Sequence, residues 1–304
     1  MNYDEKDLIV YICKKVTGIG EKTATAISVY LENLSNFFNN LDKLDKLRKV
    51  NGKKVLSSNQ IVEIENILKE YFPQKVIDER QAWILVLIRD FVKNSIKEIQ
   101  ETTLDTLLIN PFLIKAFGFD DHREVVTFYF YQKVTRSIVT SWGFAVEGLL
   151  LCSGAEKSDL EGFDIKVERD MKEFHLQVKS SPNTMSIEQV RQLNVHIQKI
   201  KDTSKQVPIL GMTYGKREQI STQIQSTLIG FPESALIGEK FWDFIAKEAG
   251  YCKRILDWIN DVMKLQPTKF SETLENKKLS LIRDWENNWG SGIESINKVL
   301  ENYL

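Results

Sequence analysis

The stretch GFDIKVERDMKEFHLQVKSSPNTM, residues 162–185, decides how this chain folds. Two runs with strand character lie on either side of Asp170-Met171, where a tight turn joins them. In the second run apolar and polar residues alternate, Phe174, Leu176 and Val178 against Glu173, His175, Gln177 and Lys179. A strand with one wet face and one dry face requires this period of two. The sequence therefore predicts an antiparallel hairpin whose polar side chains face solvent.

Helical periodicity dominates on both sides of this hairpin. Apolar residues recur at helical spacing in 7–16, 22–34, 57–72, 79–99, 121–151, 186–202 and 240–265, and a polar helix ends at Leu304. Further strands are expected at 207–215 and 225–231. Asn110-Pro111 predicts a turn, because the residue before a proline is excluded from the α region. This order predicts a mixed α/β fold.

Length and charge limit the classes of protein that fit. The 304 residues suggest two domains, a small all-α one at 1–73 that Pro73 closes and a larger one at 74–304. With 41 basic and 42 acidic residues the net charge is −1, so a site for a polyanion must be a local patch. No apolar run has the roughly 20 residues of a membrane helix, and the first residues lack a signal-peptide pattern. We expect a cytoplasmic globular protein without membrane contact.

The few cysteines and histidines argue against zinc and against a disulfide framework. The three cysteines are far apart and outside any CxxC spacing. The residues concerned are Cys13, Cys152, Cys252, His122, His175 and His196. We expect them to be buried small hydrophobes or half-exposed rings.

Residues 16–27, VTGIGEKTATAI, place two glycines between two short helices. Gly18 and Gly20 allow positive φ and keep side chains away, so their N–H groups can face a phosphate oxygen. Lys22 and the backbone near Thr23 would add charge and donors at the start of the second helix. A structural glycine turn beside a solvated charged face is the alternative interpretation.

This segment resembles the helix-hairpin-helix motif of DNA repair and recombination proteins over about residues 8–31. The resemblance implies contact with the DNA backbone without base reading. A degenerate second copy, in which Gly52 stands alone, is expected at 47–64. Residues 43–54 hold six basic side chains and one acidic one, a local charge of +5. These residues are Lys43, Asp45, Lys46, Arg48, Lys49, Lys53 and Lys54.

Asp164 and Lys179 lie on the two strands of the hairpin, so antiparallel pairing would bring Asp164 near Gln177 and Lys179 on one face. Glu147, on the preceding helix, is placed so that its carboxylate could reach the same point. Asp164, Glu147 and the carbonyl of Val178 are oxygen ligands of the kind that Mg²⁺ prefers. Lys179 could orient or help to deprotonate a water for attack on phosphorus.

These residues resemble the PD-(D/E)xK nuclease superfamily, and within it the type II restriction endonucleases, over about residues 75–262. The supporting phrases include INPFL, LQVKSSPNTMSIEQVRQLN, ILGMTYG and IGEKFWDFI. The resemblance implies that Asp164, Gln177, Lys179 and Glu147 are catalytic. Gln177 replaces the usual acid, which predicts weaker metal binding or a larger share for Glu147. His175 is either an alternative general base or, as we favour, a structural neighbour.

Related enzymes place base-reading side chains after the catalytic strand, and this segment is rich in suitable donors and acceptors. The predicted DNA-reading residues are Asn183, Thr184, Glu188, Gln189, Arg191, Gln192 and Asn194. Ser186 and Gln189 also form a capping box, which is the alternative interpretation for Gln189.

The resemblance implies a homodimer that cuts both strands of double-stranded DNA at a (pseudo)palindromic site and leaves 5′-phosphate ends. Mg²⁺ is the expected cofactor, with Mn²⁺ able to substitute, and a cognate DNA methyltransferase is the expected functional partner in a prokaryotic cell. The alternatives are a structure-specific or modification-dependent nuclease and a non-catalytic DNA-binding protein in which Gln177 marks a decayed site.

Overall fold

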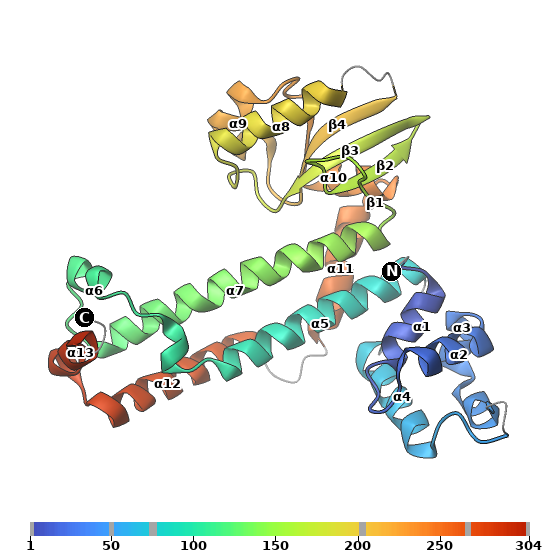
Figure 1. Ribbon diagram of the computed structural model, residues 1–304, viewed down its shortest axis with the longest axis horizontal. Helices are drawn as coiled ribbons and strands as arrows, with labels where there is room; N and C mark the ends of the chain where they lie inside the picture. The colour runs from blue at the N-terminus through green and yellow to red at the C-terminus, as the bar shows by residue number, and fades with distance from the viewer. Residues whose placement is uncertain (1–2, 49–51, 73–77, 201–204, 265–268, 302–304) are drawn as a thin grey trace. The chain divides into compact units, whose positions relative to one another are not determined.

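A computed structural model describes residues 3–48, 52–72, 78–200, 205–264 and 269–301. As predicted, the fold is mixed α/β, with one five-stranded sheet flanked by helices (Figure 1). The chain forms two compact units, Met1–Leu87 with Val146–Met263, and Ile88–Ala145 with Lys264–Leu304. Pro73 lies outside the described residues, so the domain boundary at 73/74 stays a prediction. No helix within the described ranges has the length and apolarity needed to cross a membrane.

The first unit begins with short helices, α1 (Glu5–Cys13), α2 (Glu21–Leu31), α3 (Leu34–Asn39), a 3₁₀ helix (Leu41–Lys46) and α4 (Ser58–Tyr71). Ser57 caps α4 in a capping box with Gln60. Two long helices, α5 (Glu79–Glu101) and α7 (His122–Cys152), follow in the chain, as their apolar periodicity predicts. The Trp83 indole N–H of α5 donates to the Asp4 carbonyl at 3.2 Å, which attaches α1 to α5.

The sheet has the order β1-β2-β3-β4-β5. The strands are β1 (Glu156–Lys157), β2 (Ile165–Arg169), β3 (Lys172–Lys179), β4 (Gln206–Met212) and β5 (Ala235–Ile237). β1, β2 and β3 pair antiparallel, and β3, β4 and β5 pair parallel. The predicted hairpin is confirmed: Asp170 (φ 51°) and Met171 (φ 60°) form its turn in the left-handed region that a two-residue hairpin turn uses.

The prediction that one face of β3 is exposed to solvent is wrong, because helices cover both faces of the sheet (Figure 1). On one face α8 (Ile187–Ile200) and α9 (Thr222–Thr227) form a core with Leu210 and Met212 of β4. On the other, α10 (Glu239–Ala246) packs so closely that a Cβ on Gly211 would overlap the Phe241 ring. β3 is the central strand, so His175 is fully buried rather than solvated.

Three local expectations are corrected. The strand expected at 225–231 is helix α9 and a turn, because Ser221 caps a helix that buries Ile224; the strand comes later, as β5. Asn110 begins helix α6 (Pro111–Phe117) instead of a plain turn, since its side chain accepts two backbone N–H groups. The single helix expected at 240–265 is two, α10 and α11 (Tyr251–Lys264), separated at Lys247 in the left-handed region.

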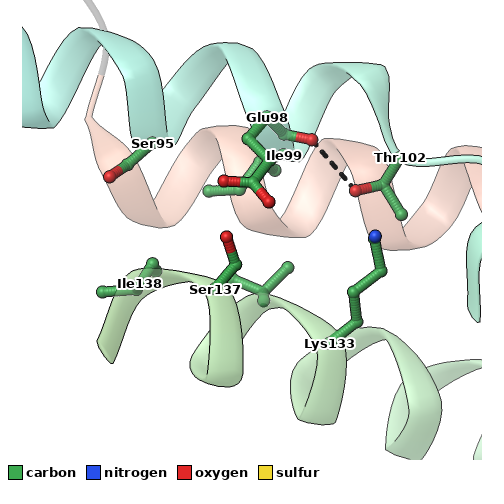
Figure 2. A pocket seen from close by; sticks show the side chains of 8 residues that line it. Ser95, Glu98, Ile99, Thr102, Lys133, Ser137 and Ile138 are labelled. Atoms are coloured by element: carbon green, nitrogen blue, oxygen red, sulfur yellow. Dashed lines mark hydrogen bonds between the residues drawn. The ribbon is translucent and has the colours of Figure 1, made fainter. Parts of the chain in front are cut away.

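The second unit is helical. Its elements are parts of α5 and α7, a 3₁₀ helix (Leu104–Leu107), α6, α12 (Phe270–Trp289) and α13 (Gly292–Glu301). Tyr129, Phe130 and Trp285 are fully buried in its core. Figure 2 shows a small crevice between α5 and α7, lined by side chains that include Glu98, Lys133 and Ser137. The Thr102 hydroxyl beside it donates to the Glu98 carbonyl at 3.0 Å, a bond internal to α5.

Candidate active site

The register of the hairpin brings the predicted catalytic side chains of β2 and β3 together. Ile165 lies opposite Leu176, so one further step places Asp164 opposite Gln177. Lys179 is two residues beyond Gln177 and therefore points to the same face. Lys179 is the last residue of β3, and its carbonyl accepts the Thr213 N–H at 3.0 Å. The three side chains therefore converge at the carboxyl end of a parallel strand pair, where α/β proteins commonly bind ligands.

Two hydrogen bonds fix Asp164 against β3, and a third joins it to Ser158 after β1. Its N–H donates to the Leu176 carbonyl at 2.9 Å, and its Oδ2 accepts the Val178 N–H at 2.6 Å. The Ser158 N–H donates to the Asp164 carbonyl at 3.3 Å. Asp164 is exposed, and within the described residues its Oδ1 accepts no hydrogen bond from the protein. One carboxylate oxygen is thus anchored to the sheet while the other is available to a ligand.

Gln177 carries an unusual acceptor. Its Oε1 is buried and has no hydrogen-bond partner among the described residues. A buried acceptor without a donor costs free energy, so such an atom calls for an explanation. Because an amide oxygen is a normal ligand of a hard divalent cation, a metal ion bound beside Asp164 would satisfy it.

The remaining donors also fit such an ion. The Val178 N–H points toward Asp164, and because N–H and C=O of one strand residue point to the same side, the Val178 carbonyl faces that edge too. Within the described ranges no group of three or more His, Cys, Asp or Glu side chains could hold a metal. A single carboxylate with carbonyl oxygens suits Mg²⁺, which keeps several waters and takes phosphate oxygens as ligands.

Lys179 is half-buried and forms no ion pair within the described part of the chain. Its charge is therefore not neutralised by a carboxylate of the protein. An unpaired ammonium beside a carboxylate and an unpaired amide oxygen attracts an anionic ligand, such as a phosphate.

Glu147 forms a different contact from the one predicted. Its Oε1 lies 3.0 Å from the Lys157 Nζ, an ion pair between α7 and β1. Lys157 lies opposite Ile165, the neighbour of Asp164. The role of Glu147 as a metal ligand stays a prediction.

Some of the predicted base-reading side chains after β3 already form contacts within the protein, and others do not. Gln189 forms the capping box with Ser186, and both ends of the Asn194 amide bind the backbone of Thr227 and Ile229. Glu188 pairs with Arg191 at 3.6 Å, and the Thr184 hydroxyl donates to the Ser181 carbonyl at 3.0 Å. Asn183 and Gln192 are exposed, and among the described residues their side-chain amides form no hydrogen bond; the Asn183 backbone N–H donates to the Ser181 hydroxyl at 3.3 Å.

The glycine hairpin joins α1 to α2 as predicted, but its two glycines differ. Gly18 has φ +79°, whereas Gly20 has φ −89° and is the N-cap of α2, so positive φ at Gly20 was a wrong expectation. A Cβ on Gly20 would meet nothing within 4 Å. Neither backbone strain nor packing requires a glycine there. Lys22 is exposed and Thr23 half-exposed in the first turn of α2.

The expected second glycine hairpin is only partly described, because Lys49 lies outside the described residues. Gly52 has φ +76°, and Arg48 and Lys54 form an isolated β-bridge around it. The ammonium of Lys54 binds the Asp45 carboxylate and holds its pKa below the usual value. This ion pair neutralises one of the basic side chains of the predicted patch.

The cysteines and histidines have structural environments. Burial raises the pKa of the thiols of Cys13 and Cys152 to about 12, so neither is a nucleophile at neutral pH. His122 binds Glu286 at 3.1 Å within the second unit. The His196 ring covers Gly162 so closely that a Cβ there would overlap it.

Ser158 was missed by the sequence analysis. Its hydroxyl lies 2.9 Å from Nδ1 of the buried His175, and its N–H holds the Asp164 carbonyl. No sequence pattern distinguishes Ser158 from any other loop serine, since the contact exists only once the hairpin has formed.

A family model matches the chain. The sequence model described as Type II restriction endonuclease EcoO109I covers residues 78–266, more than half of the protein. The match includes the hairpin with Asp164 and Lys179 and excludes the glycine hairpin at 16–27. No curated protein matches the chain.

Proposed function

The chain belongs to the family of the type II restriction endonuclease EcoO109I, and from this premise we propose that it cuts both strands of DNA at a specific (pseudo)palindromic site. The cut depends on Mg²⁺, or on Mn²⁺ in its place, and leaves 5′-phosphate ends. The observation that carries the proposal is the convergence of Asp164, Lys179 and the unpartnered Gln177 Oε1 at one end of β3.

The residues that would hold the ion are Asp164 through Oδ1, Gln177 through Oε1 and Val178 through its carbonyl, with Glu147 as a further ligand once it leaves Lys157. When bound, Mg²⁺ neutralises charge that develops on the phosphate and favours in-line attack by water. The Lys179 ammonium would bind the phosphate and orient the attacking water, and its positive charge would make that water easier to deprotonate by solvent. The bond from phosphorus to O3′ breaks, so the phosphate stays on the 5′ end.

A homodimer follows from the substrate. A palindrome presents the same half-site twice, and a two-fold protein dimer presents one catalytic hairpin to each strand. Asn183 and Gln192 are the best placed of the predicted base-reading residues, because they are exposed and uncommitted. Amide side chains pair with adenine through two hydrogen bonds. A cognate methyltransferase would protect the same site in the host.

The experiment that tests the proposal is digestion of sequenced plasmid DNA with the purified protein, with Mg²⁺ and with chelator. Discrete fragments whose ends carry 5′-phosphate support it, and their sequences give the site. Methylated plasmid and branched DNA are included as substrates. Cutting only of the methylated or only of the branched DNA would replace the proposal by a modification-dependent or a structure-specific nuclease. Binding without cutting in Mg²⁺ and Mn²⁺ would leave a DNA-binding protein.

We further propose that the glycine hairpin grips the DNA backbone. Gly20 supports this, because a glycine that neither φ nor packing requires leaves room for an external group at the N-terminus of α2. Gly20→Asp is expected to weaken DNA binding by roughly 10- to 150-fold, since charge-assisted hydrogen bonds are worth about 1.5–3 kcal/mol. The same change stabilises α2 by a few tenths of a kcal/mol, because aspartate is a better N-cap than glycine.

Fluorescence anisotropy and thermal unfolding of Gly20→Asp measure these two effects, which have opposite signs. Asn33→Asp is the matched control, because it adds the same charge at the N-cap of α3. The control is expected to bind DNA as the parent does. Equal losses of affinity in the two variants would show a general charge effect and remove the hairpin from the DNA interface.

Gln177→Glu is expected to lower the Mg²⁺ concentration for half-maximal cleavage by roughly tenfold, because a charged ligand binds a hard cation more tightly than an amide. Gln177→Leu should raise that concentration while keeping or increasing the free energy of unfolding, since the buried unpaired oxygen is lost. Mg²⁺ titrations of the cleavage rate and urea unfolding measure both. Unchanged titrations in both variants would exclude Gln177 as a ligand.

A further inference from the structure

The loop of residues 158–164, between β1 and β2, carries Asp164 into the site. Asp164 lies just before β2, so β2 alone does not fix its backbone. Two main-chain hydrogen bonds do so, from the Asp164 N–H to the Leu176 carbonyl at 2.9 Å and from the Ser158 N–H to the Asp164 carbonyl at 3.3 Å. Ser158 therefore supplies one of the two main-chain hydrogen bonds that place Asp164.

Ser158 is held by its hydroxyl. The Ser158 Oγ accepts the Leu160 N–H at 3.1 Å and lies 2.9 Å from the His175 Nδ1. The serine oxygen has a second lone pair and one hydrogen, so it can either accept a hydrogen bond from Nδ1 or donate one to it, according to the tautomer of His175. In both cases this hydrogen bond ties the loop that carries Ser158 to the strand that carries His175.

His175 is a rigid anchor. Its side chain is 0% exposed, and it lies in the middle of β3, opposite Lys166 on one side and Pro208 on the other. The Phe163 ring meets it edge-on, with 6.2 Å between ring centroids. Of the charged groups that pack against the ring, the Glu173 Oε2 lies 3.6 Å from Nε2, too far for a hydrogen bond.

The Nε2 atom of His175 has no hydrogen-bond partner among the described residues. An aliphatic side chain at this central position would fill the core without burying an unpaired ring nitrogen. The imidazole therefore costs free energy at a place where only its Nδ1 makes a hydrogen bond. The hydrogen bond to Ser158 offsets this cost, and it connects His175 to the loop that carries Asp164.

We propose that His175 and Ser158 are positioning residues, which set Asp164 at the correct place relative to Gln177 and Lys179. His175 lies on β3, the strand that carries Gln177 and Lys179. Its hydrogen bond to Ser158 therefore ties the loop that carries Asp164 to that same strand. This inference rests on the proposed function. It also removes His175 from the list of general bases, because a fully buried ring cannot reach a scissile phosphate.

The test compares Ser158→Ala with Ser158→Thr, which keeps the hydroxyl. Ser158→Ala is expected to raise the Mg²⁺ concentration for half-maximal single-turnover cleavage by about 10- to 100-fold, the usual loss when a group that orients a metal ligand is removed. DNA affinity measured without metal stays unchanged, because no DNA-contacting group moves. Ser158→Thr is expected to restore the Mg²⁺ dependence of the parent.

Ser234→Ala is the matched control. Its hydroxyl also ends in a backbone contact, to the Ile229 carbonyl at 2.9 Å, but in the loop before β5. The control is expected to keep the Mg²⁺ dependence of the parent. His175→Asn, which retains a polar group near the Nδ1 position, should raise the Mg²⁺ concentration for half-maximal cleavage less than His175→Leu does. If the His175 variants do not fold, the comparison of Ser158→Ala with Ser158→Thr tests the proposal by itself.

Mn²⁺ binding followed by calorimetry provides a second readout that needs no cleavage. A parent that cleaves DNA, together with Ser158→Ala showing the Mg²⁺ dependence and Mn²⁺ affinity of the parent, would overturn the positioning role alone. Equal losses in Ser158→Ala and Ser158→Thr would also overturn it, since the hydroxyl would not matter. A parent that neither cleaves nor binds Mn²⁺ would overturn the proposed function and this inference together.

Discussion

Lys179→Ala is expected to lower the single-turnover rate of DNA cleavage by on the order of 10²- to 10³-fold, the usual loss when a donor to the charge that develops in the transition state is removed. Asp164→Asn is expected to lose at least as much, because it removes the charge that attracts the cation. Both side chains are at the edge of the core, Asp164 exposed and Lys179 half-buried, so neither change should unfold the protein.

Quenched-flow or gel assays of cleavage at saturating Mg²⁺ measure this loss, and metal-free anisotropy verifies that DNA still binds. Lys172→Ala is the matched control, since Lys172 begins the same strand that Lys179 ends. The control should cleave at the rate of the parent. Undiminished cleavage by both Lys179→Ala and Asp164→Asn would show that the hairpin is not the catalytic site.

The second large effect concerns the contact between α10 and the sheet. Phe241→Ala is expected to reduce the free energy of unfolding by about 3–5 kcal/mol, because the ring is fully buried against β4. Gly211→Ala should cost about 1–3 kcal/mol by overpacking, since its new methyl group would overlap that ring. Combining the two should cost less than their sum, because the methyl group then enters the cavity.

Urea unfolding of the parent, the two single variants and the double variant gives this coupling energy. Gly143→Ala on α7 serves as the control, because a Cβ there meets nothing within 4 Å and φ is not positive. The control is expected to gain roughly 0.5–1 kcal/mol from helix propensity. Strict additivity of the Gly211 and Phe241 changes would contradict the close packing of α10 on β4.

The hairpin and its register could be predicted because both depend on local pattern. Alternation defines β3, and antiparallel pairing across Asp170-Met171 places Asp164 opposite Gln177 by simple counting. The burial of His175 could not be predicted in this way. Alternation distinguishes the two faces of a strand, but it does not tell whether a helix such as α8 packs on the second face.

Other side chains were misjudged because their roles depend on contacts between elements. Asn194 has the donor and acceptor set that suits adenine, yet both groups bind the backbone of the α9 region. The apolar residues of 225–231 favoured a strand prediction. Ser221, which caps α9, and Ile224, which is buried by it, were the residues that indicated a helix instead. In each case a tertiary contact decides between two chemically reasonable uses of the same residues.

The sheet has short borders, with β1 of two residues at one edge and β5 of three at the other. A long bare edge is what allows a sheet to recruit a strand from another chain and to grow into an aggregate. The eight-residue β3 lies at the centre, paired on both sides. Because the edge strands are short and the long strands lie inside the sheet, the folded protein exposes little strand edge on which amyloid-like growth could begin.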